Sequence, residues 1–332
     1  MLRRETEGNP ERMSAALAGL RRYQEARRAP PPQPPAAVAS AYGAALRGYG
    51  GAGPAVLFVP SLINPPNILD LSEGNSLLRW LAAEGGVRPY LLDWGWGVDA
   101  RAELSVAGHV EHILLPLAAT LGGQAPLVGY CLGGTMAAAA GQILSAPVAT
   151  IAAPWRFAGF PEASRSLLAD LWSSAKPAVE RLGLLPMEVL QSAFWGLDPA
   201  RTIAKFETFG RLEPDAKGAA AFVTLEDWAN DGPPIPGAAA RELFEDMFAA
   251  DLTGRGAWHV GGTAIDPAFG TAPSLHLVST SDRIVPAATA FPGSRIDVAQ
   301  GHVGMVIGRA AREAVWQPLA QWLTRVAPRA RS

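Results

Sequence analysis

The segment Gly129-Tyr130-Cys131-Leu132-Gly133-Gly134 is the strongest indication of the fold, and it carries the only cysteine of the 332 residues. An apolar strand-like run, Pro126-Leu127-Val128, precedes it, and an alanine-rich helix-like run, Met136 to Ala140, follows it. A strand, a tight glycine-flanked turn and a helix form the setting of a nucleophile elbow. Small residues are needed on both sides because the nucleophile's backbone is strained and the helix packs close to the strand.

Serine is the usual residue at such a turn, so the cysteine indicates which chemistry to expect. A thiolate that attacks a thioester exchanges one thioester for another, and the acyl group stays activated for a second transfer. Cysteine therefore fits acyl transfer to an alcohol at least as well as hydrolysis. The alternative is a small buried apolar residue, as most lone cysteines are. The flanking glycines favour the nucleophile.

The composition limits the class of protein. With 49% hydrophobic and 17% charged residues the chain can bury a large core, and its length suits one α/β domain with an insertion, or two domains. A net charge of −2 gives no support for a nucleic-acid partner. A single cysteine excludes an internal disulfide and fits a reducing, cytoplasmic compartment. The first residues lack the apolar region of a signal peptide.

From Ile113 to Trp155 the sequence contains no Asp, Glu, Lys or Arg. A transmembrane helix needs about 20 continuous apolar residues, but prolines and glycine pairs interrupt this stretch repeatedly. Central parallel strands are covered on both faces and read in the same way. We therefore expect buried core here and no transmembrane segment.

The remaining pattern alternates strands and helices, which predicts a mostly parallel central sheet with helices on both faces. Residues 1–35 form an N-terminal appendage, either disordered or bound to a partner, with a helix over 10–28 and a proline-rich linker over 29–35. We assign 36–154 and 263–332 to the core and 155–262, helical and rich in aromatic residues, to an inserted cap over the active site. A helix is expected over 104–121 and another over 309–325, the latter with Trp316 and Trp322 facing inward. The expected strands are 55–60, 89–93, 126–131, 147–153, 274–279 and 295–299.

Two further candidates follow sheet strands. Asp282 comes after the strand at 274–279, and His302, between Gly301 and Val303-Gly304, comes after the strand at 295–299. Residues past the carboxyl ends of such strands lie at the active-site edge. The order nucleophile, acid, histidine is that of α/β-hydrolases. A solvated turn carboxylate and a structural loop histidine are the alternatives for these two residues.

The other histidines are less informative. His109 and His112 lie three apart, which fits either a metal pair or, in our reading, a pair on a helix surface. No third ligand with motif spacing follows, so we expect no metal site. His276 lies within a strand and is expected in the core. The segment from Asp93 to Gly97 either shapes the pocket or forms a structural turn.

Together these motifs resemble the polyhydroxyalkanoate (poly-3-hydroxybutyrate) synthases, especially the short two-component type within the α/β-hydrolase superfamily. The resemblance extends over most of the chain. It runs through the segments 59–71, 90–95, 129–135, 228–237, 281–286 and 301–305.

The resemblance implies that Cys131 is the nucleophile, His302 its base and Asp282 the third member of the triad. The oxyanion would be met by the backbone N–H groups of Leu132 and Ile63. The resemblance further implies a 3-hydroxyacyl-coenzyme A substrate, a polyester product and no permanently bound cofactor. Partners would be the polyester chain or granule surface and a helical helper subunit, with a homodimer as one option for assembly.

The chain departs from the family pattern at a few positions. It reads Asp251-Leu252-Thr253 where the family's cap usually has an asparagine before the leucine, and His109 stands near the expected place of a tyrosine. Two alternatives to a synthase therefore stay open. One is a cysteine hydrolase (thioesterase, lactone hydrolase or polyester depolymerase), and the other is a non-catalytic homologue that binds granules or a partner.

Overall fold

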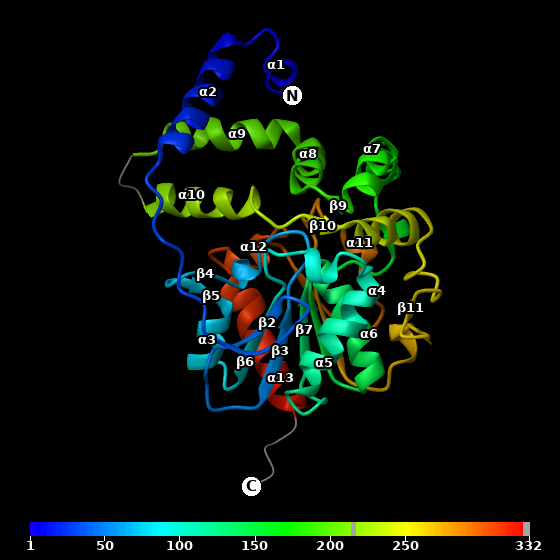
Figure 1. The fold of residues 1–332 in the computed structure, drawn as a ribbon. Helices are drawn as coiled ribbons and strands as arrows, with labels where there is room; N and C mark the ends of the chain where they lie inside the picture. Colours follow the sequence, from blue (N-terminus) through cyan, green and yellow to red (C-terminus); the bar gives the residue numbers. More distant parts are fainter. Residues whose placement is uncertain (214–216, 328–332) are drawn as a thin grey trace.

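The computed structural model describes residues 1–213 and 217–327; positions 214–216 of the expected cap and 328–332 of the expected core lie outside the described residues. Within these ranges the central sheet has eight strands (Figure 1). Their spatial order is β1 (Ala37–Ala41), β2 (Ala44–Gly48), β6 (Arg88–Asp93), β3 (Ala55–Val59), β7 (Leu127–Tyr130), β8 (Val148–Ile151), β13 (Ser274–Ser279) and β14 (Arg295–Val298).

The sheet is parallel from β6 to β14, and β1 and β2 extend it as an antiparallel hairpin. The strands expected from the sequence are all present, but the hairpin was not anticipated. Its composition explains the omission, because β1 and β2 are rich in alanine, which has a low preference for strands. Two-residue and three-residue strands form small pairs outside the sheet: β4 (Asp70–Ser72) with β5 (Asn75–Ser76), β9 (Leu184–Leu185) with β10 (Ile235–Pro236), and β11 (His259–Val260) with β12 (Thr263–Ala264).

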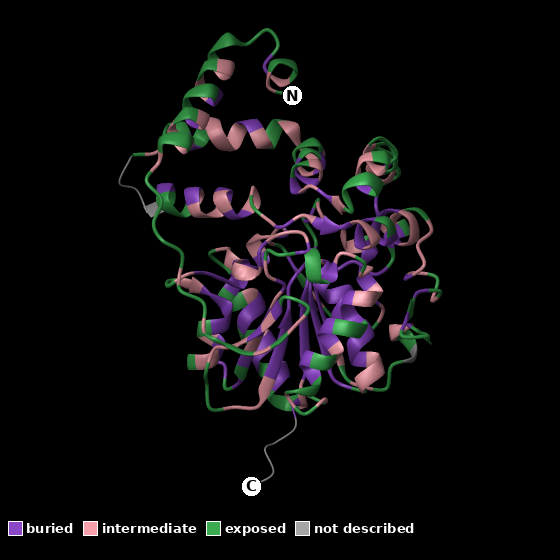
Figure 2. Cartoon of the chain, viewed as in Figure 1, coloured by how far each residue is buried: buried purple, intermediate pink, exposed green. Residues whose placement is uncertain are grey.

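Helices cover both faces of the sheet (Figure 1). One face packs under α4 (Val106–His109), a π-helical turn (Val110–Leu114), α5 (Leu115–Ala119) and α6 (Leu132–Leu144). The other packs under α3 (Leu77–Ala83), α12 (Gly304–Ile307), a second π-helical turn (Arg312–Trp316) and α13 (Gln317–Val326). Side chains of β3 alternate between the two cores, with Leu57 in one and Phe58 in the other. The strands are thus buried on both sides, as parallel strands in such sheets are (Figure 2). Trp316 and Trp322 are buried, as predicted.

The segment between β8 and β13 supplies most of the helices above the carboxyl ends of the strands (Figure 1). They are α7 (Glu162–Leu182), α8 (Met187–Leu197), α9 (Pro199–Gly210), α10 (Lys217–Ala229), α11 (Gly237–Arg241) and a π-helical segment (Glu242–Ala249). Short 3₁₀ turns complete the chain at Pro66–Leu69, Asp99–Arg101, Phe157–Gly159, Pro267–Phe269 and Ala287–Thr289. We refer to residues 155–262 as the cap.

The N-terminal segment is not a free appendage. After the short α1 (Leu2–Glu5), α2 (Pro10–Glu25) lies along α9 (Figure 1). Gly19 allows this close approach, because a Cβ there would fall 1.9 Å from the carbonyl oxygen of Phe206. The Tyr23 hydroxyl donates to the Asp227 carboxylate at 2.6 Å, and Arg12 pairs with Glu207. The first 28 residues therefore pack on the cap helices α9 and α10.

Candidate active site

The geometry of the elbow explains its glycines. Cys131 stands between β7 and α6 with φ 55° and ψ −132°, a conformation that side chains rarely adopt. A Cβ at Gly129 would fall 2.3 Å from the Cα of Gly134, and one at Gly133 would fall 2.1 Å from the carbonyl oxygen of Val59. The strand, the turn and the helix are thus in backbone contact, and only glycine fits. This packing holds the cysteine in its strained conformation at the end of the strand.

Asp282 and His302 form a hydrogen-bonded pair beside the cysteine. Because β13 and β14 run parallel to β7, the loops after their carboxyl ends meet at the same edge of the sheet. The Nδ1–H of His302 donates to Oδ2 of Asp282 at 2.6 Å. The other carboxylate oxygen accepts the backbone N–H groups of Ile284 at 2.7 Å and Val285 at 3.0 Å. With both oxygens bonded, Asp282 holds the imidazole in one orientation, with Nε2 free for the cysteine.

The electrostatics of this pair favour a charged imidazole. Burial alone would lower the pKa of His302, but the negative charge of Asp282, followed by that of Cys131, and the hydrogen bond to Asp282 outweigh it. The pKa of His302 is therefore raised above its usual value of 6.5. An imidazolium next to a cysteine stabilises the thiolate, which is the nucleophilic form.

Tyr130, the residue before the nucleophile, supports the histidine. Its ring lies 5.1 Å from the His302 ring, centroid to centroid, and its hydroxyl donates to the His302 carbonyl oxygen at 3.5 Å. Complete burial, above all, raises the pKa of Tyr130 well above 10, so the phenol stays neutral. The sequence pattern gave no reason to single out this tyrosine.

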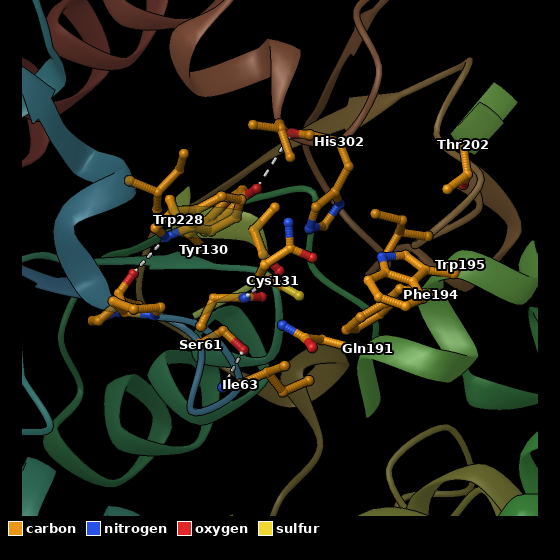
Figure 3. Close-up of a pocket in the computed structure, with 18 of the residues that line it drawn as sticks. Ser61, Ile63, Tyr130, Cys131, Gln191, Phe194, Trp195, Thr202, Trp228 and His302 are labelled. Atoms are coloured by element: carbon orange, nitrogen blue, oxygen red, sulfur yellow. Dashed lines mark hydrogen bonds between the residues drawn. The ribbon is translucent and has the colours of Figure 1, made fainter. Parts of the chain in front are cut away.

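The two predicted oxyanion donors differ in their surroundings. Leu132 is the first residue of α6, where a backbone N–H has no acceptor within the helix. Ile63 lies in the loop after β3, but its N–H donates to the Ser61 hydroxyl at 3.1 Å. Ser61 itself faces the pocket (Figure 3). The role of both donors stays a prediction.

Above the sulfur lies a cavity of about 180 Å³ between the sheet edge and the cap (Figure 3). This is small compared with the roughly 300–1,000 Å³ of sites for drug-sized ligands, so it suits an acyl group. The core contributes Pro60, Ser61, Ile63, Asn64, Pro65, Ile68, Tyr130, Cys131, Ile284, His302 and Val303, and the cap contributes Gln191, Phe194, Trp195, Thr202, Lys205, Trp228, Ala229 and Asn230.

The segment beginning at Trp228 fastens the cap to the loop after β3. The indole N–H of Trp228 donates to the carbonyl oxygen of Pro65 at 2.9 Å, and the Asn64 amide donates to that of Asp231 at 3.2 Å. Asp251, which stands where the family pattern has an asparagine, also has a structural role. Its carboxylate accepts the backbone N–H of Phe157 at 2.7 Å.

Three other sequence motifs lie away from the cavity. His109 is fully buried and packs edge to face on Trp94, so the prediction of a helix-surface pair with His112 was wrong. Burial lowers the pKa of His109 to about 4. The Trp94 indole donates to the carbonyl oxygen of Pro60 at 3.1 Å, which makes the segment after β6 a support for the neighbouring loop. His276 is buried, as expected for the core.

In the described part of the chain no group of three or more histidine, cysteine, aspartate or glutamate side chains could hold a metal ion. No helix among the described residues combines the length and the apolar character that membrane crossing requires.

The fold is that of the α/β-hydrolases, as the sequence predicted. Solved structures with the same fold include an esterase from Thermogutta terrifontis, with TM-score 0.50 and 18% identity over 90% of this chain and 100% of that one. A monoacylglycerol lipase from Paleococcus ferrophilus has TM-score 0.51 and 18% identity over 85% of this chain and 98% of that one. At this identity the similarity establishes the fold alone.

The curated relatives of the chain are poly(3-hydroxyalkanoate) polymerase subunits, which confirms the resemblance drawn from the motifs. The PhaC subunit of Haloarcula marismortui is 25% identical over 285 residues, 80% of this chain and 60% of the relative. The PhaC subunit of Allochromatium vinosum is 25% identical over 284 residues, 81% of this chain and 80% of the relative. The chain thus spans about 60% of the length of the Haloarcula relative. No protein-family model matches the chain.

Proposed function

We propose that the protein is a polyhydroxyalkanoate synthase-like acyltransferase that moves 3-hydroxyacyl groups from coenzyme A to the hydroxyl end of a polyester. The observation that carries the proposal is the strained Cys131 beside the bonded pair of His302 and Asp282, under a cap that lines the cavity with aromatic as well as polar side chains. Similarity to polymerase subunits over 80% of the chain supports the choice of substrate class.

In the first half-reaction the Cys131 thiolate attacks the thioester carbonyl carbon. The negative charge that develops on the carbonyl oxygen is stabilised by the N–H of Leu132 and by a donor from the loop that contains Ile63. The C–S bond to coenzyme A breaks, the leaving thiolate takes the proton from His302, and the acyl group remains on Cys131 as a thioester.

In the second half-reaction the hydroxyl of another unit attacks this thioester. His302 Nε2 takes the hydroxyl proton, an ester forms, and the Cys131 thiolate is released. The bonding of Asp282 favours an orienting role over direct action on the hydroxyl, because both carboxylate oxygens already accept hydrogen bonds. Water is the competing acceptor, and the aromatic side chains of the cap would limit its access.

The proposed enzyme uses no resident cofactor; coenzyme A enters as part of the substrate. A cytoplasmic location at the granule surface and a helical helper subunit are part of the same proposal. They follow from the resemblance.

Incubation with 3-hydroxybutyryl-coenzyme A tests the proposal directly. Release of free thiol together with insoluble polymer supports it. Release of thiol with soluble 3-hydroxybutyrate and no polymer would make the protein a cysteine hydrolase instead. If neither polymer nor soluble 3-hydroxybutyrate forms, with or without a candidate helper subunit, both reactions are rejected for this substrate. Mass spectrometry of the intact protein during turnover should show an acyl adduct on Cys131.

A further inference from the structure

Helix α8 of the cap presents one face to the cavity. Gln191, Phe194 and Trp195 lie three and four residues apart, which places them on the same side of the helix. In the close-up, Gln191 points toward the space next to Cys131, and the two aromatic side chains lie beside it (Figure 3). Trp195 is 43% exposed, whereas Gln191 is 9% exposed. The cap wall therefore has a buried amide close to the sulfur and an aromatic surface that reaches solvent.

The Gln191 amide makes no hydrogen bond to another residue in the described parts of the chain, 1–213 and 217–327. Gln191 is mostly buried and lines the cavity. When a bound substrate displaces water from the cavity, the amide costs free energy unless a polar group of that substrate bonds to it. Across the cavity lies Ser61, whose buried hydroxyl accepts the Ile63 N–H and keeps its own proton to donate.

We propose that Gln191 is a positioning residue that recognises the 3-hydroxyl of the acyl group on Cys131. This inference rests on the proposed function and deepens it. The 3-hydroxyl lies two carbons from the thioester carbon, so it must sit in the inner part of the cavity where the amide points. An amide both donates to and accepts from a hydroxyl, whereas an acyl chain without the 3-hydroxyl would leave it unpaired. Sites of this kind reject analogues that lack the hydroxyl.

The decisive experiment compares two thioesters that differ only in this group. Single-turnover acylation of Cys131 is measured with 3-hydroxybutyryl-coenzyme A and with butyryl-coenzyme A, in the wild type and in Gln191→Leu. We expect Gln191→Leu to slow acylation by the hydroxyacyl thioester about 10-fold, as for loss of one hydrogen bond. Acylation by the butyryl thioester should not slow, because the variant has no amide for that substrate to leave unpaired. The selectivity ratio of the variant should therefore fall by at least about 10-fold.

Phe194→Leu is the matched control, because it changes the same helix face without removing a polar group. We expect it to alter both rates by the same factor. The ratio within one variant cancels any loss of folded protein, and Gln191→Met provides a second, unbranched replacement. An unchanged ratio in both Gln191 variants would overturn this inference while leaving the acyltransferase intact. Absence of any Cys131 adduct in the wild type would instead overturn the proposed function.

Discussion

The sheet wall and the cap wall of the cavity differ in how their backbones are packed. On the sheet side, a Cβ at Gly134 would fall 2.2 Å from the Cβ of Ala153, and Gly129 and Gly133 are equally crowded. On the cap side the packing is uneven: a Cβ at Gly232 would fall 2.7 Å from the carbonyl oxygen of Ile63, whereas one at Gly218 of α10, away from the cavity, would meet nothing within 4 Å. The groups assigned to bond making thus sit on backbone that cannot shift, and the cap combines tight backbone contacts with stretches that have open space around them.

Side-chain hydrogen bonds also join the cap to its neighbours. Trp228 and Asn64 connect it to the loop after β3, and Tyr23 connects the N-terminal segment to α10. The two walls should therefore respond differently to substitution. Changes on the sheet side should abolish chemistry or folding, and changes on the cap side should alter access and selectivity.

The largest effect is expected from Cys131→Ala. The variant should form no acyl adduct, and thiol release from 3-hydroxybutyryl-coenzyme A should fall by at least about 10⁴-fold, as when a catalytic nucleophile is removed. Intact-protein mass spectrometry and a thiol assay measure the two results. A covalent adduct that persists in the variant would remove Cys131 from the mechanism.

Asp282→Asn should slow turnover by roughly 10³ to 10⁴-fold while the fold is kept, since the imidazole loses its orienting charge. It should also change the pH dependence. In the wild type the pKa of His302 is raised, so its imidazolium persists above pH 6.5 and is lost only as the pH rises through the raised value. Without the Asp282 charge the alkaline limb of the acylation rate should move to lower pH. Stopped-flow acylation across pH measures the shift; wild-type rates in the variant would place the acid elsewhere.

Most of the sheet side could be predicted from the sequence because its constraints are local. The glycines around Cys131 mark a backbone contact within a few residues, and Asp282 and His302 each follow a strand, so topology alone brings them to one edge. The curated relatives support the family resemblance but leave the triad roles as predictions.

The positions of the residues on the cap side could not be predicted from the sequence. The position of Gln191 depends on how α8 is placed over the sheet, and its spacing from Phe194 and Trp195 is shared by any amphipathic helix. The packing of α2 depends on a contact between Gly19 and Phe206, which are far apart in the chain. The buried position of His109 was likewise set by tertiary packing against Trp94, which its helical spacing did not reveal.

Gly134→Ala tests the crowding of the sheet side through stability. The new methyl group would have to displace Ala153, and overpacking of this kind costs about 1–3 kcal/mol of unfolding free energy. Gly218→Ala is the matched substitution in the cap, where the space is open and removal of a helical glycine stabilises by up to about 1 kcal/mol. Denaturant unfolding of both variants measures the contrast. Equal effects would refute the difference between the two walls.

The smallest effect is expected from Tyr23→Phe, which removes the hydrogen bond between the N-terminal segment and the Asp227 carboxylate. Burial first, and then the hydrogen bond to Asp227, raises the pKa of Tyr23 to about 12, so the hydroxyl keeps its proton through the neutral range. Because the contact is partly exposed, its loss should cost about 1 kcal/mol. We expect faster proteolytic cleavage within residues 26–36, which connect α2 to β1, and little change in acylation of Cys131. Arg3→Gln is the control, since no hydrogen bond or ion pair joins its side chain to another residue within 1–213 and 217–327. A large loss of acylation in Tyr23→Phe would mean that α9 and α10 need the N-terminal segment to form the cavity, and the cap would then be as tightly coupled to the chemistry as the sheet.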